Sequence, residues 1–149
     1  MNAPLLTRIS ETLKKEEGCK KNNQGKHIAY QDHLGYWTLG YGRLIDPNKP
    51  GAGLTEDEAM ALLFNNIDES IEECRKNFQW FDDIPEPVQE GLIYMCFQLG
   101  MPTLKKFKNC LAAIEEGNYA EAADHCLDSN WNKQTPRRVN IVCNLFTSV

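Results

Sequence analysis

The sequence predicts an α+β protein that is mainly helical, with a small β-rich lobe, a larger helical lobe and a long helix between them. Three observations support this fold class. Apolar residues recur at spacings of three and four over most of the chain, which is typical of amphipathic helices. Residues 28–44 break that pattern with aromatic and β-branched residues and three glycines, which favours a small sheet. Directly behind them, residues 60–78 keep one apolar stripe for about five turns.

The front of the chain alternates between helix, sheet and loop. Residues 4–17 carry Leu6, Ile9 and Leu13 on one helical face and are expected to end at Gly18. The polar residues 20–26 predict an exposed loop. Residues 28–44 then predict a β-hairpin or small sheet, followed by a loop that holds two prolines and two glycines.

The rest of the chain is predicted to be helical. Thr55 and Glu58 form a capping-box pattern that opens the long helix. A segment starting at Pro85 and ending at Gly100 predicts the next helix. Further helices are expected over 104–116, over 118–127 with an Asn118/Glu121 cap, and from Thr135–Pro136 onward, where Val139, Val142, Cys143 and Phe146 point inward. We expect one domain over 1–149, divided into a β-rich lobe (19–54), a connecting helix (55–79) and a helical lobe (1–18 and 80–149).

Composition excludes several classes of function. A net charge of −5 gives no concentrated basic face, so nucleic-acid binding is not expected. No apolar run approaches the roughly 20 residues of a membrane span, and charges interrupt the N-terminal stretch too often for a signal peptide. The cysteines form no C-x-x-C pair and no zinc-like spacing, so we expect no metal site. Reduced core thiols are favoured, because four cysteines fall on apolar helix faces: Cys74, Cys96, Cys126 and Cys143.

Glu17 is the first candidate for chemistry. It continues the apolar stripe four residues after Leu13 and lies in the last turn of its helix. Partial burial and the negative end of the helix dipole both disfavour a charged carboxylate there, which favours the protonated form that a general acid needs. A solvated glutamate at a helix end is the plain alternative.

Asp32, at the predicted hairpin turn, is the second candidate, followed by Thr38 on the returning strand. Glycoside hydrolysis needs two carboxylates flanking the bond, one protonated and one ionised. A hairpin folded back against the helix end would bring Asp32 opposite Glu17. Alternatively, Asp32 is only a turn former, which is a common role of aspartate.

Motifs in both halves of the chain carry a family resemblance. Glu17–Gly18, Tyr30–Gln31–Asp32 and the Gly-Tyr-Trp-Thr-Leu-Gly-Tyr-Gly run of residues 35–42 resemble, in order and in Asp-to-Thr spacing, the phage lysozyme family (glycoside hydrolase family 24). In the back half, residues 92–100 resemble the central buried helix of that family's T-even branch. Residues 131–138 resemble its Trp-x-x-Gln-Thr-Pro-x-Arg segment.

The resemblance implies a lysozyme-like fold with the catalytic trio Glu17, Asp32 and Thr38. Glu17 would protonate the leaving glycosidic oxygen, while Asp32, helped by Thr38, would position the attacking water and so invert the anomeric configuration. Arg138 would pair with Glu17 and stabilise its charged form. The implied glycan groove would be lined by Tyr41, Phe97, Gln98 and Leu99, with a plain core aromatic as the alternative for Phe97.

The chain departs from the family pattern at three places. Residues 20–26 form an insertion, which we interpret as a rim of the groove that tunes glycan access. Arg43 follows Gly42 where the family usually has histidine, which alters a supporting ion-pair site. Tyr94 stands where the central helix usually carries asparagine, which changes a groove contact or its support.

The implied function is that of an endolysin: a muramidase that cuts the β-1,4 bond between N-acetylmuramic acid and N-acetylglucosamine in bacterial peptidoglycan and lyses the host cell. We expect a monomer without a cofactor. It would begin in the host cytoplasm and reach the periplasm and cell wall through a holin acting in trans. Two alternatives stay open: a catalytically disabled wall-binding module, and a tail-associated or effector lysozyme. A cysteine hydrolase is disfavoured, because no segment resembles a cysteine-protease motif.

Overall fold

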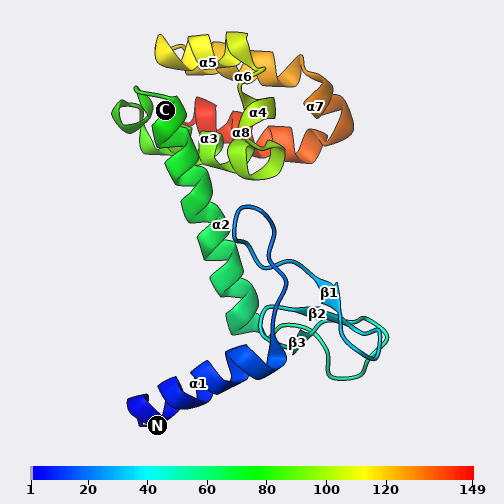
Figure 1. Cartoon of the computed structure of the whole chain (residues 1–149). Coiled ribbons are helices and arrows are strands. Elements are labelled where there is room, and N and C mark those ends of the chain that lie inside the picture. The colour runs from blue at the N-terminus through cyan, green and yellow to red at the C-terminus, as the bar shows by residue number, and fades with distance from the viewer. Residues whose placement is uncertain (1) are drawn as a thin grey trace. The chain divides into compact units, whose positions relative to one another are not determined.

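The computed structural model describes residues 2–149 and confirms the predicted α+β class. The chain divides into two compact units, Met1–Ala59 and Met60–Val149. The first holds a helix, a small antiparallel sheet and the start of the long helix, and the second is helical (Figure 1). Over residues 2–149, no helix combines the length and the apolar character needed to cross a bilayer.

The first unit is built around a three-stranded sheet. After α1 (Ala3–Glu17) come β1 (Tyr30–Gln31), β2 (Trp37–Leu39) and β3 (Arg43–Leu44), hydrogen-bonded in the order β1-β2-β3. Both pairings are antiparallel, and Thr38 is the residue of β2 that stands opposite Tyr30 on one side and Leu44 on the other. Thr38 therefore lies at the centre of the sheet.

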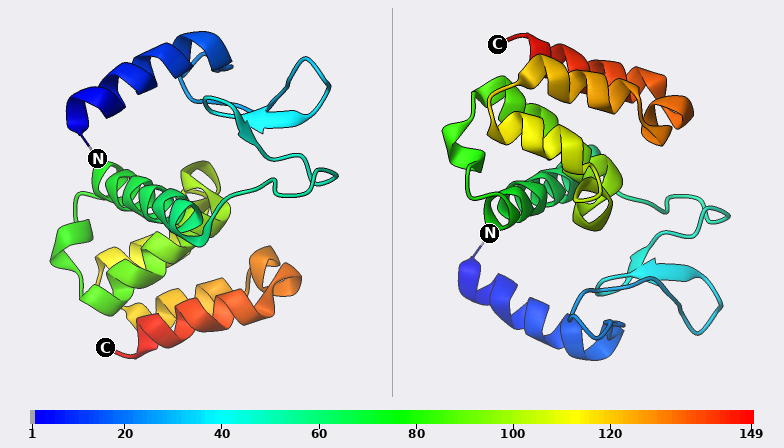
Figure 2. Two further views of the ribbon diagram at one scale, coloured as in Figure 1. Left: turned by 90° about the horizontal axis from the view of Figure 1, so that it is seen from below. Right: turned by 90° about the horizontal axis from the view of Figure 1, so that it is seen from above.

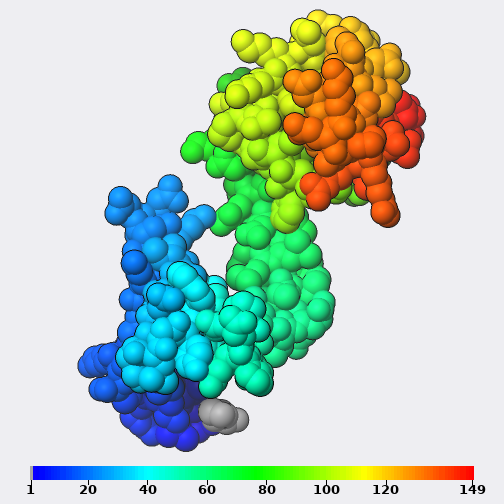
Figure 3. All heavy atoms as spheres, turned by 90° about the vertical axis from the view of Figure 1, so that its right-hand side faces the viewer, coloured from blue at the N-terminus to red at the C-terminus, as the bar shows by residue number. Residues whose placement is uncertain are grey.

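The inserted segment between α1 and β1 is an exposed turn with its own hydrogen bonds. Lys21 and His27 form an antiparallel bridge, and the Asn22 side chain accepts hydrogen bonds from the backbone N–H groups of Gln24 (2.9 Å) and Lys26 (3.0 Å). In the space-filling view this segment, in mid-blue, projects from the first unit (Figure 3). The predicted loop is thus an ordered β-like turn.

The long helix α2 (Glu56–Asn77) begins at the predicted capping box. The Glu58 N–H donates to Thr55 Oγ1 (3.2 Å), and the Thr55 N–H donates to Glu58 Oε1 (2.9 Å). The helix starts within the first unit and continues in the second. The apolar stripe predicted over residues 60–78 is buried only toward its C-terminal end, at Cys74 and Phe78, whereas Phe64 is exposed.

The second unit contains the remaining helices. They are η1 (Phe81–Asp83), α3 (Glu86–Leu99), α4 (Met101–Leu104), α5 (Lys108–Glu115), α6 (Tyr119–Leu127), α7 (Asn130–Gln134) and α8 (Pro136–Thr147). Helix α8 runs alongside α6 and also packs against α3, while α5 packs against α6 (Figure 2).

Two local predictions for this unit were wrong, and one short helix was not predicted. The helix expected over 104–116 begins only at Lys108 of α5, because α4 ends at Leu104 and a turn follows in which the Phe107 N–H donates to the Leu104 carbonyl (3.0 Å). The five-residue α7 was missed; Ser129 caps its N-terminus by accepting from the Asn132 N–H (3.3 Å). Asn118 stands at the N-cap of α6, but its side chain donates to Glu116 instead of capping the helix (3.5 Å).

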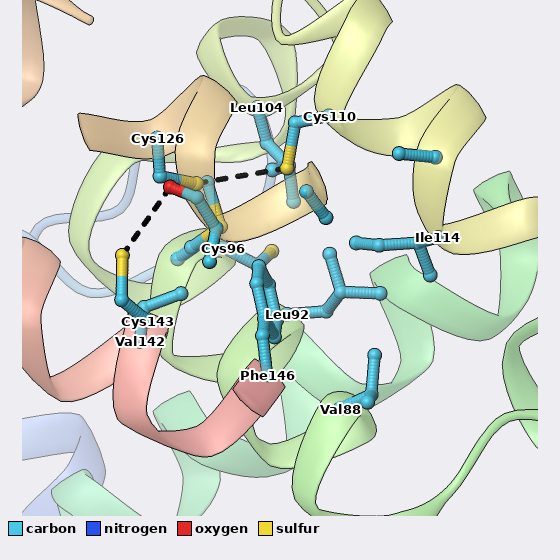
Figure 4. Packing of buried hydrophobic residues seen from close by; sticks show 14 of the residues in the cluster. Val88, Leu92, Cys96, Leu104, Cys110, Ile114, Cys126, Val142, Cys143 and Phe146 are labelled. Atoms are coloured by element: carbon cyan, nitrogen blue, oxygen red, sulfur yellow. Dashed lines mark hydrogen bonds between the residues drawn. The ribbon is translucent and has the colours of Figure 1, made fainter. Parts of the chain in front are cut away.

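The buried apolar core described by the structure lies in the second unit (Figure 4). The inward face predicted for the last helix is confirmed, since Val139, Val142, Cys143 and Phe146 are all buried. The four cysteines expected in the core are buried as well, and Cys110 is a fifth. Among the described residues the first unit buries mainly polar side chains, Thr38 and Asp46, so hydrogen bonds rather than an apolar core hold its sheet.

Candidate active site

One pocket in the first unit gathers the predicted catalytic trio. Glu17, Asp32 and Thr38 all line a hollow of about 610 Å³, together with residues of β1, β3 and the turns of the sheet. That volume falls within the ~300–1,000 Å³ range of small-molecule sites. Residues that are 15 and 21 positions beyond Glu17 in the sequence therefore contribute to the same concave surface as Glu17.

Glu17 enters the pocket from the end of α1. The helix ends because Gly18 takes a φ of +67°, which turns the chain back toward the sheet. The Glu17 carboxyl lies against the backbone of Gly42: a Cβ at position 42 would stand 2.9 Å from Glu17 Oε2 and 3.3 Å from its Cδ. Gly42 itself has a φ of +88°, so this position needs glycine both for its backbone and for the space that the carboxyl fills.

The expected partial burial of Glu17 was wrong. Its side chain is exposed, and α1 contains no buried residue. The physical reason lies in how α1 meets its own unit. The contacts described there are at the C-terminal end of the helix, where Lys14 Nζ stands 5.7 Å from the Tyr41 ring centroid and Glu17 touches Gly42. The stripe of Leu6, Ile9 and Leu13 stays exposed.

Asp32 serves both as turn former and as a pocket carboxylate. Its Oδ1 accepts the backbone N–H groups of Leu34 and Tyr36, each at 2.9 Å, which closes the turn between β1 and β2. The Asp32 backbone N–H also donates to the Tyr36 carbonyl (2.9 Å). Because these two hydrogen bonds both end on Oδ1, the carboxylate is held in one orientation while Oδ2 has capacity for a ligand or water.

Thr38 is tied to Asp32 through the backbone of Tyr36. The Thr38 hydroxyl donates to the Tyr36 carbonyl (3.1 Å), and the Tyr36 N–H donates to Asp32 Oδ1. Thr38 is buried, with 4% of its surface exposed, so the site of its hydroxyl is fixed by the sheet. Since the hydroxyl proton is used in this bond, the lone pairs of Oγ1 can accept a hydrogen bond from a molecule in the pocket.

Asp46 supports strand β2, which carries Thr38. This role was not predicted from the sequence. It is 6% exposed, and its carboxylate accepts the N–H of Trp37 on Oδ2 (3.1 Å) and of Asn48 on Oδ1 (2.9 Å). Both hydrogen bonds, with the one from Trp37 contributing most, lower the pKa of Asp46 below its ordinary value. The signal in the sequence is Asp46–Pro47–Asn48 directly after a strand, which is typical of an aspartate turn.

Charge in the pocket is mainly negative. Glu16, Glu17 and Asp32 contribute carboxylates, and Lys49 contributes an ammonium group that stands 4.8 Å from the centroid of the Tyr36 ring. Aromatic rings attract cations over their faces, so Tyr36 holds Lys49 at the edge of the pocket. Two carboxylates with different surroundings and a polar hydroxyl in one concave site are the elements of acid–base hydrolysis.

The remaining predicted site residues lie outside this pocket. Tyr41 is in the first unit, with its ring edge-on to His27 at 4.9 Å, but does not line the hollow. Phe97, Gln98 and Leu99 end α3 in the second unit, where Phe97 and Leu99 line two different surface hollows. Arg138 is exposed in the first turn of α8. Their part in a groove, and the pairing of Arg138 with Glu17, stay predictions.

Comparison with known families is decisive for the class of protein, since residues 14–144 match the model described as Phage lysozyme. The chain belongs to the phage lysozyme family. It is similar to two relatives from Dictyostelium discoideum, named Probable T4-type lysozyme 2 and Probable T4-type lysozyme 1. Each is 28% identical over an alignment of 167 positions, which spans 95% of this chain and 95% of the relative. Peptidoglycan hydrolase gp36 of Pseudomonas phage phiKMV is 27% identical over 112 residues, covering 74% of this chain but 12% of that protein.

Membership of the phage lysozyme family makes the chain a lysozyme-type glycoside hydrolase.

The departure from the family pattern at Arg43 is explained by the contacts of this side chain. Arg43 pairs with Glu58 of the capping box and donates to the Gly53 carbonyl (3.3 Å). An ion pair between β3 and the start of α2 is thus present with arginine in place of the usual histidine.

Proposed function

We propose that this chain is a muramidase that hydrolyses the β-1,4 bond between N-acetylmuramic acid and N-acetylglucosamine in bacterial peptidoglycan. The observation that carries the proposal is the convergence of Glu17, Asp32 and Thr38 on one pocket of the first unit. The name of the phage phiKMV relative, a peptidoglycan hydrolase, supports this choice of polymer.

Glu17 is the proposed general acid. Its carboxyl stands at the edge of the pocket against Gly42, where it is exposed and can reach a bound glycan. In the transition state it transfers its proton to the oxygen that leaves from the anomeric carbon, which removes the cost of expelling an alkoxide.

Asp32 and Thr38 position the attacking water. Oδ2 of Asp32 accepts one proton of this water, and the Thr38 Oγ1 lone pairs accept a hydrogen bond from the other, because the Thr38 proton is already donated to Tyr36. The water oxygen then bonds to the anomeric carbon as the glycosidic carbon–oxygen bond breaks. The Tyr36 backbone fixes the two groups relative to each other, so the water is oriented before the reaction.

The proposed stereochemical outcome is inversion. Water that attacks from the face opposite the leaving oxygen turns a β-linked sugar into an α-anomer. In this scheme Asp32 acts on the water and forms no bond to the sugar. Its Oδ1 is engaged by two backbone donors, which supports a positioning and proton-accepting role.

Product analysis of purified peptidoglycan tests the bond and the reaction type. After digestion and borohydride reduction, the new ends should be reduced muramic acid, and proton spectra of fresh soluble product should show the α-anomer first. Reduced glucosamine ends would identify a glucosaminidase instead. Anhydro-muramic ends would identify a transglycosylase, and either result would refute the proposal.

We also propose that the biological role is host lysis by an endolysin that crosses the inner membrane through a holin. The phage origin of the family supports this setting. Expression in the cytoplasm of a Gram-negative bacterium should cause lysis when a holin is co-expressed and not without it. Lysis without any holin, or intact cells with one, would contradict this role. A tail-associated or effector role would then be favoured.

A further inference from the structure

Two buried sulfur atoms in the second unit lie close together outside the catalytic pocket. Cys110 on α5 and Cys126 on α6 have their Sγ atoms 3.6 Å apart, joined by a thiol hydrogen bond. Figure 4 shows the two side chains pointing toward each other from neighbouring helices. The nearby Cys143 differs, because its sulfur contacts the Ala123 carbonyl oxygen (3.5 Å).

We propose that Cys110 and Cys126 form a disulfide when the protein meets an oxidising thiol–disulfide couple. A disulfide bond is about 2.05 Å long, so the two sulfurs need to approach by about 1.5 Å. The connection between α5 and α6 is short, with Gly117 at a φ of +83°, and the two helices pack against each other. The packing of α5 against α6 thus keeps the two positions together.

The surroundings favour Cys110 as the first thiol to react. Cys110 borders a surface hollow of about 400 Å³ that Lys106 and Lys108 also line, so an anionic disulfide such as oxidised glutathione is attracted there. Both thiols are fully buried, and the hydrogen bond with Cys110, followed by burial, raises the pKa of the Cys126 thiol. Cys126 does not line this hollow, so it is expected to react second.

The exchange with oxidised glutathione balances in two steps. The Cys110 thiolate attacks one sulfur of oxidised glutathione, so that a mixed disulfide forms and one glutathione thiolate leaves. Cys126 loses its proton and attacks the Cys110 sulfur, which releases the second glutathione thiolate. The two cysteines lose two electrons, oxidised glutathione gains them, and the two thiol protons are taken up by the two glutathione thiolates.

The product would close a loop of about 15 residues between α5 and α6 and restrict the unfolded chain. Its expected effect on the second unit is a rise in Tm of roughly 5–10 °C. The bond lies in a different unit from the catalytic pocket, so this inference stands apart from the proposed function.

Oxidised glutathione is also the probe for the test, with thiols counted in denaturant after incubation over hours. The exposed Cys19 will take a mixed disulfide, so the reference is Cys19→Ser, in which five thiols should fall to three. When Cys110→Ser is added to this reference, all four remaining thiols should stay free. The matched control is the double variant Cys19→Ser with Cys143→Ser, which also lacks one buried sulfur. In this control the number of free thiols should fall from four to two.

Peptide mapping of the oxidised native protein, which depends on no variant, should find one peptide that joins Cys110 to Cys126. Five thiols surviving in the Cys19→Ser protein would overturn the proposal. So would a map that joins any other pair of cysteines, or a loss of thiols in the Cys110→Ser variant equal to that in the control.

Discussion

Replacing Gly42 with alanine should displace the proposed acid while leaving the sheet folded. A Cβ at this position would stand 2.9 Å from Glu17 Oε2 and 3.4 Å from Glu17 Cγ. The Glu17 carboxyl is the free end of a flexible side chain, so it is expected to retreat rather than force the backbone apart. Gly40→Ala is the matched control, because Gly40 also has a positive φ (+66°) but nothing within 4 Å of its Cβ position.

The size of the effect follows from the displacement. Oε2 has to move by about 0.5 Å to reach the 3.4 Å at which ordinary van der Waals contact begins. A misplacement of about 1 Å at a reacting group lowers the rate by about 100-fold, so we expect a fall in kcat of about 10-fold or more for Gly42→Ala. The cost in stability is shared by both variants, about 1–2 kcal/mol for alanine in a left-handed conformation.

The assay is the release of reducing ends from purified peptidoglycan at several substrate concentrations, with urea unfolding measured in parallel. Gly42→Ala should lose kcat with little change in KM, and Gly40→Ala should keep kcat although it is destabilised to a similar extent. Equal kcat in the two variants would refute the argument, because both place alanine at a positive φ and only Gly42→Ala crowds Glu17.

Three further predictions concern other parts of the fold. Thr38→Val keeps the shape of the side chain but loses the water acceptor, so kcat should fall by about 100-fold while circular dichroism is unchanged; a fall below 3-fold would exclude the proposed role. Hydrogen bonds hold the pKa of Asp46 below its ordinary 3.8, so they stabilise the fold above about pH 4. This stabilisation is lost as the pH falls through the lowered pKa of Asp46. Thermal unfolding of Asp46→Asn should therefore depend less on pH below 4 than that of the native protein, and identical profiles would contradict this. Gly91→Ala would place a Cβ 2.5 Å from Phe146 Cε1, so urea unfolding should show a loss of about 1–3 kcal/mol, and an unchanged midpoint would contradict the packing.

Local signals in the sequence were enough for much of the fold. Gly18 ends α1 as expected, because its positive φ is a property of one residue. The Thr55–Glu58 capping box forms as expected, because its two partners are three residues apart. The inward face of α8 follows from helical spacing alone. Predictions of this kind succeed because the interactions stay within one or two turns of the chain.

Tertiary contacts explain what the sequence could not predict. The contact of Glu17 with Gly42 joins residues 25 positions apart, and the pairing of Cys110 with Cys126 needs two helices to pack in register. The short helix α7 was missed for the same reason. Thr135, which opens α8 as expected, donates its hydroxyl to the Trp131 carbonyl of α7 (3.2 Å) instead of capping α8.

The central claim is that Glu17 supplies the proton for glycan cleavage. The most direct measurement compares reducing-end release from purified peptidoglycan by the native protein, Glu17→Gln and Glu16→Gln. Glu16 and Glu17 are adjacent and line the same pocket, so both variants remove one negative charge from it. We predict that Glu17→Gln abolishes release with its circular dichroism spectrum intact, while Glu16→Gln stays within a few-fold of the native rate. Native-like release by Glu17→Gln, or equal losses in both variants, would contradict the assignment of Glu17 as the acid.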